Sequence, residues 1–556
     1  MTNTLLILKN NKLFWAVIAA FTIIYIRGLF NIIYGVDASI YASLSAEMSE
    51  TNNWIQLFHK GKDYLDKPPL HFWLSAASFK LFGVSTFAYK LPSFLFTVLG
   101  TYSTYKLGKL LYSAKIGKLS ALFFYTCFSI ILINQDVRTD TILVGIIVFA
   151  LWQLIAYVQT NNYFNFVLGF IGIGLAMLAK GPIGLMVPVL ALGTHFLIKK
   201  EWSNIFKWQW IPGLLITALV ISPMVWGLYQ QFDLQPNKYF ELSSGMDGTG
   251  TSGLKFYFWD QSFGRITGSN KEWIDPNASV FFFTHTFLWS FLPWSIIGVF
   301  GLVKKIKTSF SSINNSEFFT LGAIIIPFIA MSKSQFQLPH YIYVFFPLWM
   351  IITGWYFQKL SETSVWYKII RIVHIILNFA FIGVSILVLT FIFPTKSLLI
   401  WSPILLIIIA IGYLYMKTKG KNQLLYTSLA SFFCVVFVFN FYFIPKGLQY
   451  DGLYNAANES KNYKINRLFS NTIGCLTFDL YSNNKAEYIS IEELQPLANQ
   501  GNYIFIKKEF LERLKEAVEI KSIKEYPHFS LTHLNANFLN PATRENTFEY
   551  FYLAEF

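Results

Sequence analysis

Long apolar segments recur along most of this chain, from Leu13 to Ile444, with no polar linker between them. A helix needs about 20 apolar residues to cross a hydrocarbon core that is about 30 Å thick. Apolar residues make up 54% of the chain and charged residues only 13%, whereas roughly a quarter of the residues in soluble domains are charged. A soluble globule could not bury so much apolar surface, so the pattern predicts an integral membrane protein with many spans.

About thirteen segments are candidate membrane spans, and several of them are short. They are Leu13–Tyr34, Leu91–Tyr112, Leu119–Asn134, Thr141–Val158, Phe164–Ala179, Ile183–Ile198, Trp210–Leu228, Val280–Val303, Phe318–Met331, Leu338–Phe357, Ile369–Phe393, Ile400–Met416 and Leu424–Ile444. The segment Leu70–Phe82 is apolar on one side and too short to cross, so we expect a helix that lies along the membrane interface. If it crossed instead, every later segment would change sides.

Lysine and arginine residues alternate between the loops, and short cytoplasmic loops are the ones that collect them. With the N-terminus inside, every other loop is basic. Much of the net charge of +14 is then explained by topology, and no nucleic-acid partner is needed to account for it. An odd number of spans places the C-terminal end of the chain outside.

The composition becomes more polar at Lys446. We therefore expect a multi-span membrane domain over residues 1–445 and a small soluble α/β domain over residues 446–556 on the outer side. The expected elements of this tail are β-strands within Thr472–Leu480, Tyr503–Ile506 and Phe548–Leu553 and an amphipathic helix over Glu509–Val518. The tail carries no catalytic signature.

Two charged motifs belong to the first outer loop. Asp37 stands where the first span leaves the membrane, and its alternative role is that of a helix N-cap, for which Asp is a preferred residue. The loop ends in Asp66-Lys67-Pro68-Pro69-Leu70. Consecutive prolines restrict the backbone and hold Lys67 in an extended conformation beside a helix start. The alternative for Lys67 is a turn whose lysine reaches the lipid headgroups.

The later outer loops carry further charges, each of which could be an ordinary turn or an interfacial residue. They are found in Asp136–Asp140, Ala179–Pro182, Phe258–Arg265 and Met331–Tyr341. Together the outer loops bring Asp37, Asp66, Asp140, Lys67, Arg265 and Lys333 to one membrane face. Carboxylates can activate a nucleophile or bind a metal, and cations can neutralise a phosphate. This set of residues suits the breaking of a bond to a phosphate ester.

The order of these motifs resembles that of membrane glycosyltransferases of the GT-C class. The nearest members are the bacterial lipid A aminoarabinose transferases and the protein O-mannosyltransferases, and the resemblance runs from Asp37 to about Pro347. It implies an enzyme that transfers a sugar from a polyprenyl phosphate to a lipid, glycan or protein acceptor, with inversion at the anomeric carbon. It also implies a bacterial inner membrane location with the active site outside, and no nucleotide.

The resemblance assigns roles to single residues. Asp37 matches the catalytic acid of the first loop and is the candidate base, Asp140 matches a second acid, and Lys67 matches the lysine that meets the donor phosphate. Arg265 and Lys333 are similar to further phosphate or acceptor contacts. The residues expected to bind an acceptor or a metal are Asp66, Arg138, His340 and Tyr341. The aminoarabinose transferases usually have Glu where this chain has the shorter Asp66, and the need for a divalent metal stays open.

Two other classes of protein remain as alternatives. A multi-span transporter of a lipid-linked or anionic substrate would use charges near the middle of the bilayer, usually on broken helices in repeated halves. The main such charge here is Arg27, which lies near the outer end of a span, within reach of the interface. A structural membrane protein would leave the charges of the outer loops without a common task.

Overall fold

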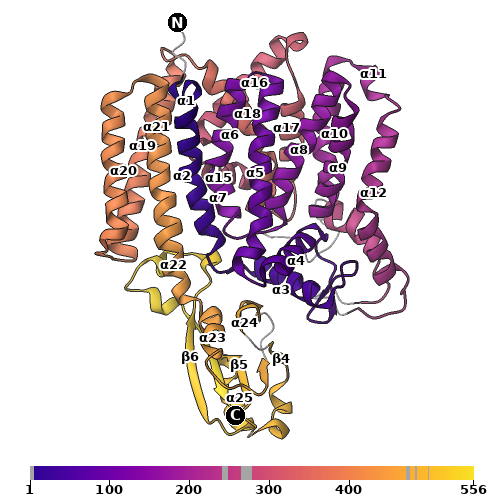
Figure 1. Ribbon diagram of the computed structural model, residues 1–556, viewed down its shortest axis with the longest axis vertical. Helices are drawn as coiled ribbons and strands as arrows, with labels where there is room; N and C mark the ends of the chain where they lie inside the picture. The colour runs from indigo at the N-terminus through magenta and orange to yellow at the C-terminus, as the bar shows by residue number, and fades with distance from the viewer. Residues whose placement is uncertain (1–4, 241–247, 265–277, 471–475, 483–484, 499) are drawn as a thin grey trace. The chain divides into compact units, whose positions relative to one another are not determined.

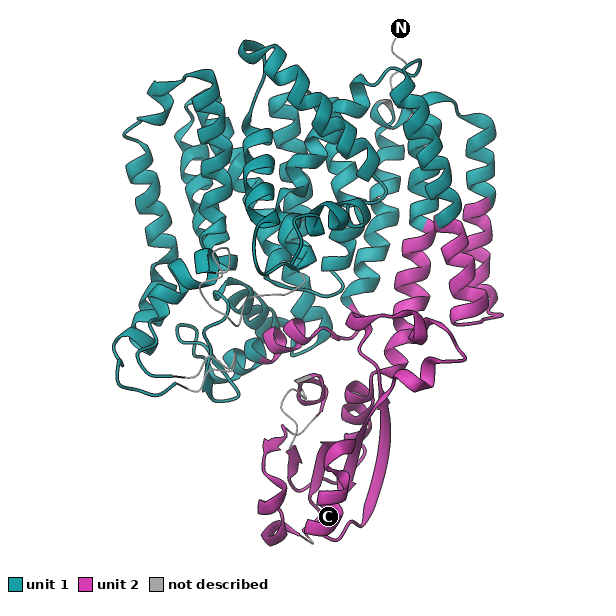
Figure 2. Cartoon of the chain, turned by 180° about the vertical axis from the view of Figure 1, so that it is seen from behind, with its two compact units in different colours: residues 1–29, 44–380, 409–433 teal, residues 30–43, 381–408, 434–556 magenta. Residues whose placement is uncertain are grey.

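The chain divides into two compact units (Figure 2), which consist of residues 1–29, 44–380 and 409–433 and of residues 30–43, 381–408 and 434–556. The structure is a computed structural model that describes residues 5–240, 248–264, 278–470, 476–482, 485–498 and 500–556. The predicted domain boundary between residues 445 and 446 stays a prediction.

Every predicted span contains helix, and most of the helices stand side by side in Figure 1. They are α2 (Asn11–Leu29), α5 (Thr86–Leu111), α6 (Ala114–Tyr125), α7 (Phe128–Ile133), α8 (Thr139–Thr160), α9 (Tyr163–Lys180), α10 (Ile183–Lys199), α12 (Trp210–Leu228), α15 (Phe282–Ser290), α16 (Ser295–Ser311), α17 (Phe319–Ser332), α18 (Phe346–Lys359), α19 (Val365–Leu387), α20 (Leu398–Lys417) and α21 (Gly420–Val438). Seven helices of the described chain are long and apolar enough to cross a membrane. The chain is an integral multi-pass membrane protein.

Two predicted spans are interrupted, and their breaks meet each other. The segment Leu119–Asn134 divides into α6 and α7, and Val280–Val303 divides into α15 and α16 near Pro293, because proline lacks an N–H and cannot continue a helix. The N–H of Phe128 donates to the carbonyl of Leu292 at 2.9 Å. Backbone groups that the breaks release are thus satisfied inside the protein, as a membrane interior requires.

Helix α8 is the centre of the first unit. It is almost completely buried along its length and packs on α5 and α9. It crosses α5 where two glycines meet: a Cβ on Gly145 would lie 2.2 Å from the carbonyl oxygen of Phe96, and one on Gly100 would lie 3.0 Å from the Cα of Gly145. The absence of side chains at this crossing lets the two backbones approach closely, as in other membrane helix pairs.

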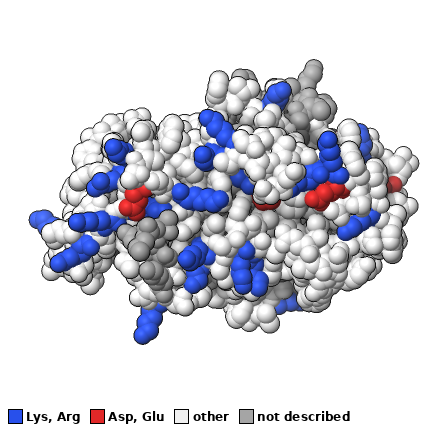
Figure 3. All heavy atoms as spheres, turned by 90° about the horizontal axis from the view of Figure 1, so that it is seen from above, with Lys and Arg blue, Asp and Glu red and all other residues white. Residues whose placement is uncertain are grey.

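Lysine and arginine residues are spread over one end of the helices, where acidic residues are few (Figure 3). This end carries the loops between α5 and α6, α10 and α12, α16 and α17, α18 and α19, and α20 and α21. The basic residues near these turns are Lys106, Lys109, Lys115, Lys118, Lys199, Lys200, Lys207, Lys304, Lys305, Lys307, Lys359, Lys368, Arg371, Lys417, Lys419 and Lys421. The loops predicted to be cytoplasmic thus share one end, and the side of the membrane that it faces stays a prediction.

The expected first outer loop is largely folded. It contains helix α3 (Val36–Thr51) and a hairpin of β1 (Phe58–His59) and β2 (Lys62–Asp63). The turn has positive φ at Lys60 and Gly61, and the backbone N–H groups of both residues donate to the carboxylate of Glu47 at 2.7 and 3.3 Å. Helix α4 follows over Leu70–Phe82, with the predicted bounds. Its predicted position along the interface stays a prediction.

The tail contains a five-stranded sheet in the order β4-β3-β5-β7-β6, in which β3 is parallel to β4 and β5 and the other pairs are antiparallel. The strands are β3 (Leu468–Ser470), β4 (Glu487–Tyr488), β5 (Tyr503–Lys507), β6 (Ser522–His528) and β7 (Glu549–Glu555). Both faces of the sheet are apolar: Phe505 packs with helices α23 (Gly452–Ser460) and α24 (Leu476–Tyr481), while Ile504 packs with α25 (Leu511–Ala517).

The predicted α/β character of the tail is confirmed, with one wrong element. The predicted strands at Tyr503–Ile506 and Phe548–Leu553 correspond to β5 and β7, and the predicted helix at Glu509–Val518 corresponds to α25 and the 3₁₀ turn before it. In the segment Thr472–Leu480, residues 476–480 belong to helix α24, and residues 472–475 lie outside the described residues. This helix buries Phe478 against the sheet, so packing on the sheet decides its conformation over local β-propensity.

Candidate active site

Asp140 is the centre of a buried group of charges in the first unit. It lies in the first turn of α8, and its carboxylate forms an ion pair with Lys180, the last residue of α9. His340 Nε2, from the 3₁₀ helix Pro339–Phe345, lies 3.7 Å from Asp140 Oδ2. The Asp140 side chain is only 6% exposed. A carboxylate at a helix start and a lysine at a helix end are both favoured by the helix dipoles.

Lys180 also contacts an aromatic ring. Its Nζ lies 4.4 Å from the centroid of the Tyr341 ring, within the range of a cation–π interaction. Gly181 follows with a φ of +89°, a conformation that glycine adopts without strain. It ends α9 directly after the lysine, and α10 begins two residues later at Ile183. This sharp reversal holds the Lys180 side chain at the end of the helix.

Lys67 lies four residues after the end of β2 and directly before the two prolines that lead into α4. Its Nζ lies 2.8 and 2.7 Å from the two carboxylate oxygens of Asp66, and its side chain is 14% exposed. The side-chain amide of Gln261, from the π-helix η2 (Phe256–Gly264), donates to Asp66 at 3.2 Å. The lysine is therefore held by a carboxylate that has a second donor of its own.

The loop before α8 contains a third ion pair. Arg138 donates from Nε at 3.0 Å and from Nη2 at 2.9 Å to one oxygen of Asp136. The backbone of this loop is tied to α5 and α4, because the hydroxyl of Tyr89 donates to the carbonyl of Val137 at 3.0 Å and lies 3.1 Å from His71 Nε2. The helix that follows Lys67 is thus linked to this loop through the hydroxyl of Tyr89.

These pairs form one group of charges, which we call the charge cluster: Asp66, Lys67, Asp136, Arg138, Asp140, Lys180 and His340. His340 interacts electrostatically with Lys67 and Arg138 as well as with Asp140 and Lys180. Three carboxylates face three cations, so the cluster is neutral when the histidine is neutral. A bound anion would therefore have to compete with a carboxylate for each cation.

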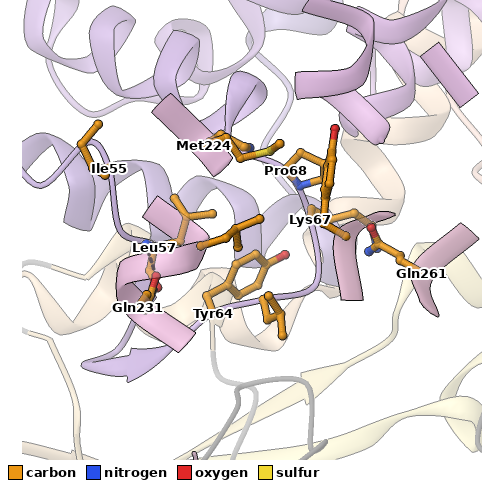
Figure 4. A pocket seen from close by; sticks show the side chains of 12 residues that line it. Ile55, Leu57, Tyr64, Lys67, Pro68, Met224, Gln231 and Gln261 are labelled. Carbon is orange, nitrogen blue, oxygen red and sulfur yellow. Dashed lines mark hydrogen bonds between the residues drawn. The ribbon is translucent and has the colours of Figure 1, made fainter. Parts of the chain in front are cut away.

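A small pocket adjoins Lys67 (Figure 4). Lys67 and Gln261 stand on one side of it, with Leu57 and Gln231 opposite. Its lining residues are Ile55, Leu57, Tyr64, Leu65, Lys67, Pro68, Pro69, Met224, Leu228, Gln231, Tyr257 and Gln261. The wall is mostly apolar, and Lys67 supplies its positive charge.

The structure brings together six of the residues that the motifs singled out. Asp66, Lys67, Arg138, Asp140 and His340 belong to the charge cluster, and Tyr341 contacts it. Asp37 lies in the first turn of α3, inside the helix, within the segment 30–43 that belongs to the second unit. Lys333 is exposed at the C-cap of α17 and forms no ion pair within the described residues. Arg265 lies outside the described residues.

The sequence motifs that contain Lys180 and Asp136 predict no role for either residue. The signal for Lys180 was its place at a helix end directly before Gly-Pro. The signal for Asp136 was its spacing from Arg138, which allows a local ion pair. Neither pattern identifies the residue that pairs with Lys180. It is the ion pair with Asp140 that makes Lys180 part of the site.

A metal ion does not fit the described part of this site. Within those residues no three His, Cys, Asp or Glu side chains are arranged to hold one. Asp66 faces Lys67, and Asp140 faces Lys180, so each carboxylate already has a cation beside it.

Known proteins share sequence with the region that holds this cluster. The family model described as dolichyl-phosphate-mannose-protein mannosyltransferase matches residues 66–226. An undecaprenyl phosphate-alpha-4-amino-4-deoxy-L-arabinose arabinosyl transferase of Edwardsiella ictaluri is 24% identical over 344 residues, which are 60% of this chain and 56% of that protein. A second one, from Proteus mirabilis, is 22% identical over 418 residues, with shares of 71% and 69%. The chain thus spans little more than half the length of the first of these relatives.

Solved structures match almost the whole chain. The apo crystal structure of ArnT from Cupriavidus metallidurans has a TM-score of 0.71 at 16% identity and covers 91% of this chain and 94% of its own. The chain has the ArnT fold. The same ArnT bound to undecaprenyl phosphate also has a TM-score of 0.71, with coverage of 98% and 97%. The ArnT fold confirms the predicted class of a helical membrane domain with a small α/β domain, and the predicted resemblance to GT-C glycosyltransferases is confirmed as well.

Proposed function

We propose that this protein is an inverting glycosyltransferase that moves a sugar from a polyprenyl phosphate to an acceptor hydroxyl at the membrane surface. The relatives are named for an undecaprenyl phosphate-linked arabinose derivative, and one ArnT structure contains undecaprenyl phosphate. We therefore propose undecaprenyl phosphate as the carrier and a bacterial inner membrane as the location. The acceptor class is a lipid, a glycan or a protein hydroxyl.

The observation that carries this proposal is the position of Lys67 at a mostly apolar pocket. A lipid-linked phosphate needs both properties at once, because its tail is apolar and its head is anionic. Leu57, Leu65, Met224 and Leu228 supply the apolar surface, and Lys67 supplies the charge. A soluble phosphate ester would not need such a wall. The donor phosphate would replace Asp66 as the partner of Lys67.

The chemistry is a single displacement. The acceptor oxygen attacks the anomeric carbon, the bond from that carbon to the phosphate oxygen breaks, and the polyprenyl phosphate leaves with the electron pair. Asp37 takes the proton of the acceptor hydroxyl as general base. Lys67 stabilises the negative charge that grows on the leaving phosphate. We propose that Arg265 and Lys333 help to stabilise this charge.

Asp140 has a different environment from that of a free base. Its carboxylate is buried and paired with Lys180. We propose that Asp140 orients Lys180 and His340 toward the donor phosphate or the acceptor, with Arg138 and Tyr341 beside them. Asp140 remains the second candidate for the base, because it would be freed if a phosphate drew Lys180 away.

The location of the charges favours a transferase over a transporter. Asp140 and Lys180 stand at the ends of α8 and α9, and Lys67 stands before α4. Transporters bind their substrates near the middle of the bilayer, on discontinuous helices. A site at helix ends has access to the lipid headgroup region, where a donor phosphate lies.

Replacing Lys67 by Met should weaken donor binding or turnover by roughly one to two decades. A charge-assisted contact is worth about 1.5–3 kcal/mol, and every 1.4 kcal/mol is about tenfold. The measurement is transfer of a labelled sugar from its polyprenyl phosphate by purified protein. The matched control is Lys62→Met, which removes an exposed lysine from the hairpin that precedes Lys67. Equal donor affinity in Lys67→Met and wild type would show that Lys67 does not bind the donor phosphate.

The tail should face away from the cytoplasm. The basic loops alternate and the expected number of spans is odd, so a reporter fused after Ile444 should give an extracytoplasmic signal. A fusion in the basic loop between α10 and α12 should give the opposite signal. A cytoplasmic signal from the reporter after Ile444 would mean that α4 crosses the membrane or that one short span does not.

A further inference from the structure

The segment that carries Asp37 is hydrogen-bonded to the tail within the second unit. The backbone N–H of Ile33 donates to the hydroxyl of Tyr481 at 2.8 Å. The hydroxyls of Ser39 and Thr477 lie 3.0 Å apart, and these two side chains are only 2% and 5% exposed. Both contacts join residues 30–43 to a single helix, α24.

The two contacts come from one face of α24 and lie on either side of Asp37. Thr477 and Tyr481 are four residues apart on α24, so their side chains lie on the same helix face. Ile33 and Ser39 bracket Asp37, which lies four residues after the first and two residues before the second. One face of α24 therefore restrains the backbone on both sides of the carboxylate.

Helix α24 is itself firmly seated. Phe478 is completely buried, and its ring stacks on that of Phe505 in β5 with centroids 4.3 Å apart. The ring of Tyr481 packs edge to face against Tyr454 of α23 at 5.0 Å. On the other side, Ile32 and Tyr34 pack against an apolar cluster of the second unit. The segment is thus held by packing at its start and by two hydroxyls around Asp37.

We propose that the tail is part of the catalytic apparatus, with Thr477 and Tyr481 as positioning residues for Asp37. This inference rests on the proposed function, in which Asp37 is the base. A general base must be within hydrogen-bond reach of the proton that it takes, and a displacement of about 1 Å can cost about 10²-fold in rate. A connecting segment after a membrane helix needs no such restraint for stability alone.

The first test measures the restraint without measuring activity. In the full-length protein, hydrogen exchange of the Ile33 amide should be about threefold to tenfold faster in Tyr481→Phe than in wild type, because the variant keeps the ring and loses only the acceptor oxygen. The matched control is Tyr526→Phe, whose hydroxyl lies 3.1 Å from Glu459 within the same tail. Exchange at Ile33 that is equal in Tyr481→Phe and Tyr526→Phe would overturn the proposal.

The second test measures positioning. The double variant Thr477→Val with Tyr481→Phe should lower kcat by about tenfold or more with an unchanged KM for the donor, because Lys67 and its pocket are untouched. The conservative variant Thr477→Ser with wild-type Tyr481, which keeps both hydroxyls, should retain most of the rate. A double variant with normal kcat would overturn the proposal even if exchange at Ile33 rises.

The two proposals fail in different ways. If Asp37→Asn keeps normal turnover, the assignment of the base is wrong, whatever happens at Ile33. If Asp37→Asn is inactive while the double variant turns over normally, the assignment of Asp37 as the base is supported, but the tail does not position it.

Discussion

Asp37→Asn should lower turnover by about 10²- to 10⁴-fold, the usual contribution of a general base, while the variant inserts normally and still binds donor. Asn keeps the shape of the side chain and loses the basic oxygen. The alternative role of Asp37 is that of a helix-start residue. A carboxylate in the first turn of a helix contributes only about 0.3–1 kcal/mol through the dipole, and Asn and Asp rank together as caps.

The matched control is Glu50→Gln, which makes the same change at an exposed position of the same helix, α3. It should keep normal turnover. Transfer should be measured under single-turnover conditions with purified protein, so that donor binding and chemistry are separated. Normal turnover in Asp37→Asn would contradict the catalytic assignment and move it to Asp140.

Lys305→Met should destabilise the membrane unit by about 3–5 kcal/mol, since removing one partner of a buried ion pair leaves the other charge uncompensated. Lys305 is 3% exposed, and its Nζ lies 2.8 Å from Glu317 Oε1. Glu317 also accepts hydrogen bonds from the hydroxyl of Tyr112 and from the backbone and side chain of Thr320. This group joins the ends of α5, α16 and α17 at the basic end of the helices.

The control for this prediction is Lys304→Met, which removes the neighbouring, exposed lysine. It should leave the midpoint of thermal unfolding nearly unchanged, because exposed charges contribute little. The double variant Lys305→Met with Glu317→Gln should recover part of the lost stability, since no buried charge is then left unpaired. Equal unfolding midpoints for Lys305→Met and Lys304→Met would show that the pair does not stabilise the unit.

The membrane fold could be predicted from the sequence because one physical constraint dominates it. A backbone in lipid must satisfy its own hydrogen bonds, so a long apolar run becomes a helix whatever surrounds it. The bounds of α4 at Leu70 and Phe82 were predicted correctly for a similar reason, since Pro68 and Pro69 precede the helix and Gly83 follows it. The predicted strand within Thr472–Leu480 was wrong because a short segment takes the conformation that its packing favours.

Sequence patterns also predict which charges stand at helix ends, and hence the chemistry of the candidate site. The partners of these charges depend on how the helices pack. Asp140 and Lys180 are forty residues apart and meet because α8 and α9 are antiparallel. The hydrogen bonds between α24 and the segment around Asp37 join residues that are more than four hundred positions apart in the sequence. Sequence spacing predicts contacts only within one helix or hairpin, whereas the partners of a charge at a helix end depend on which other ends pack beside it.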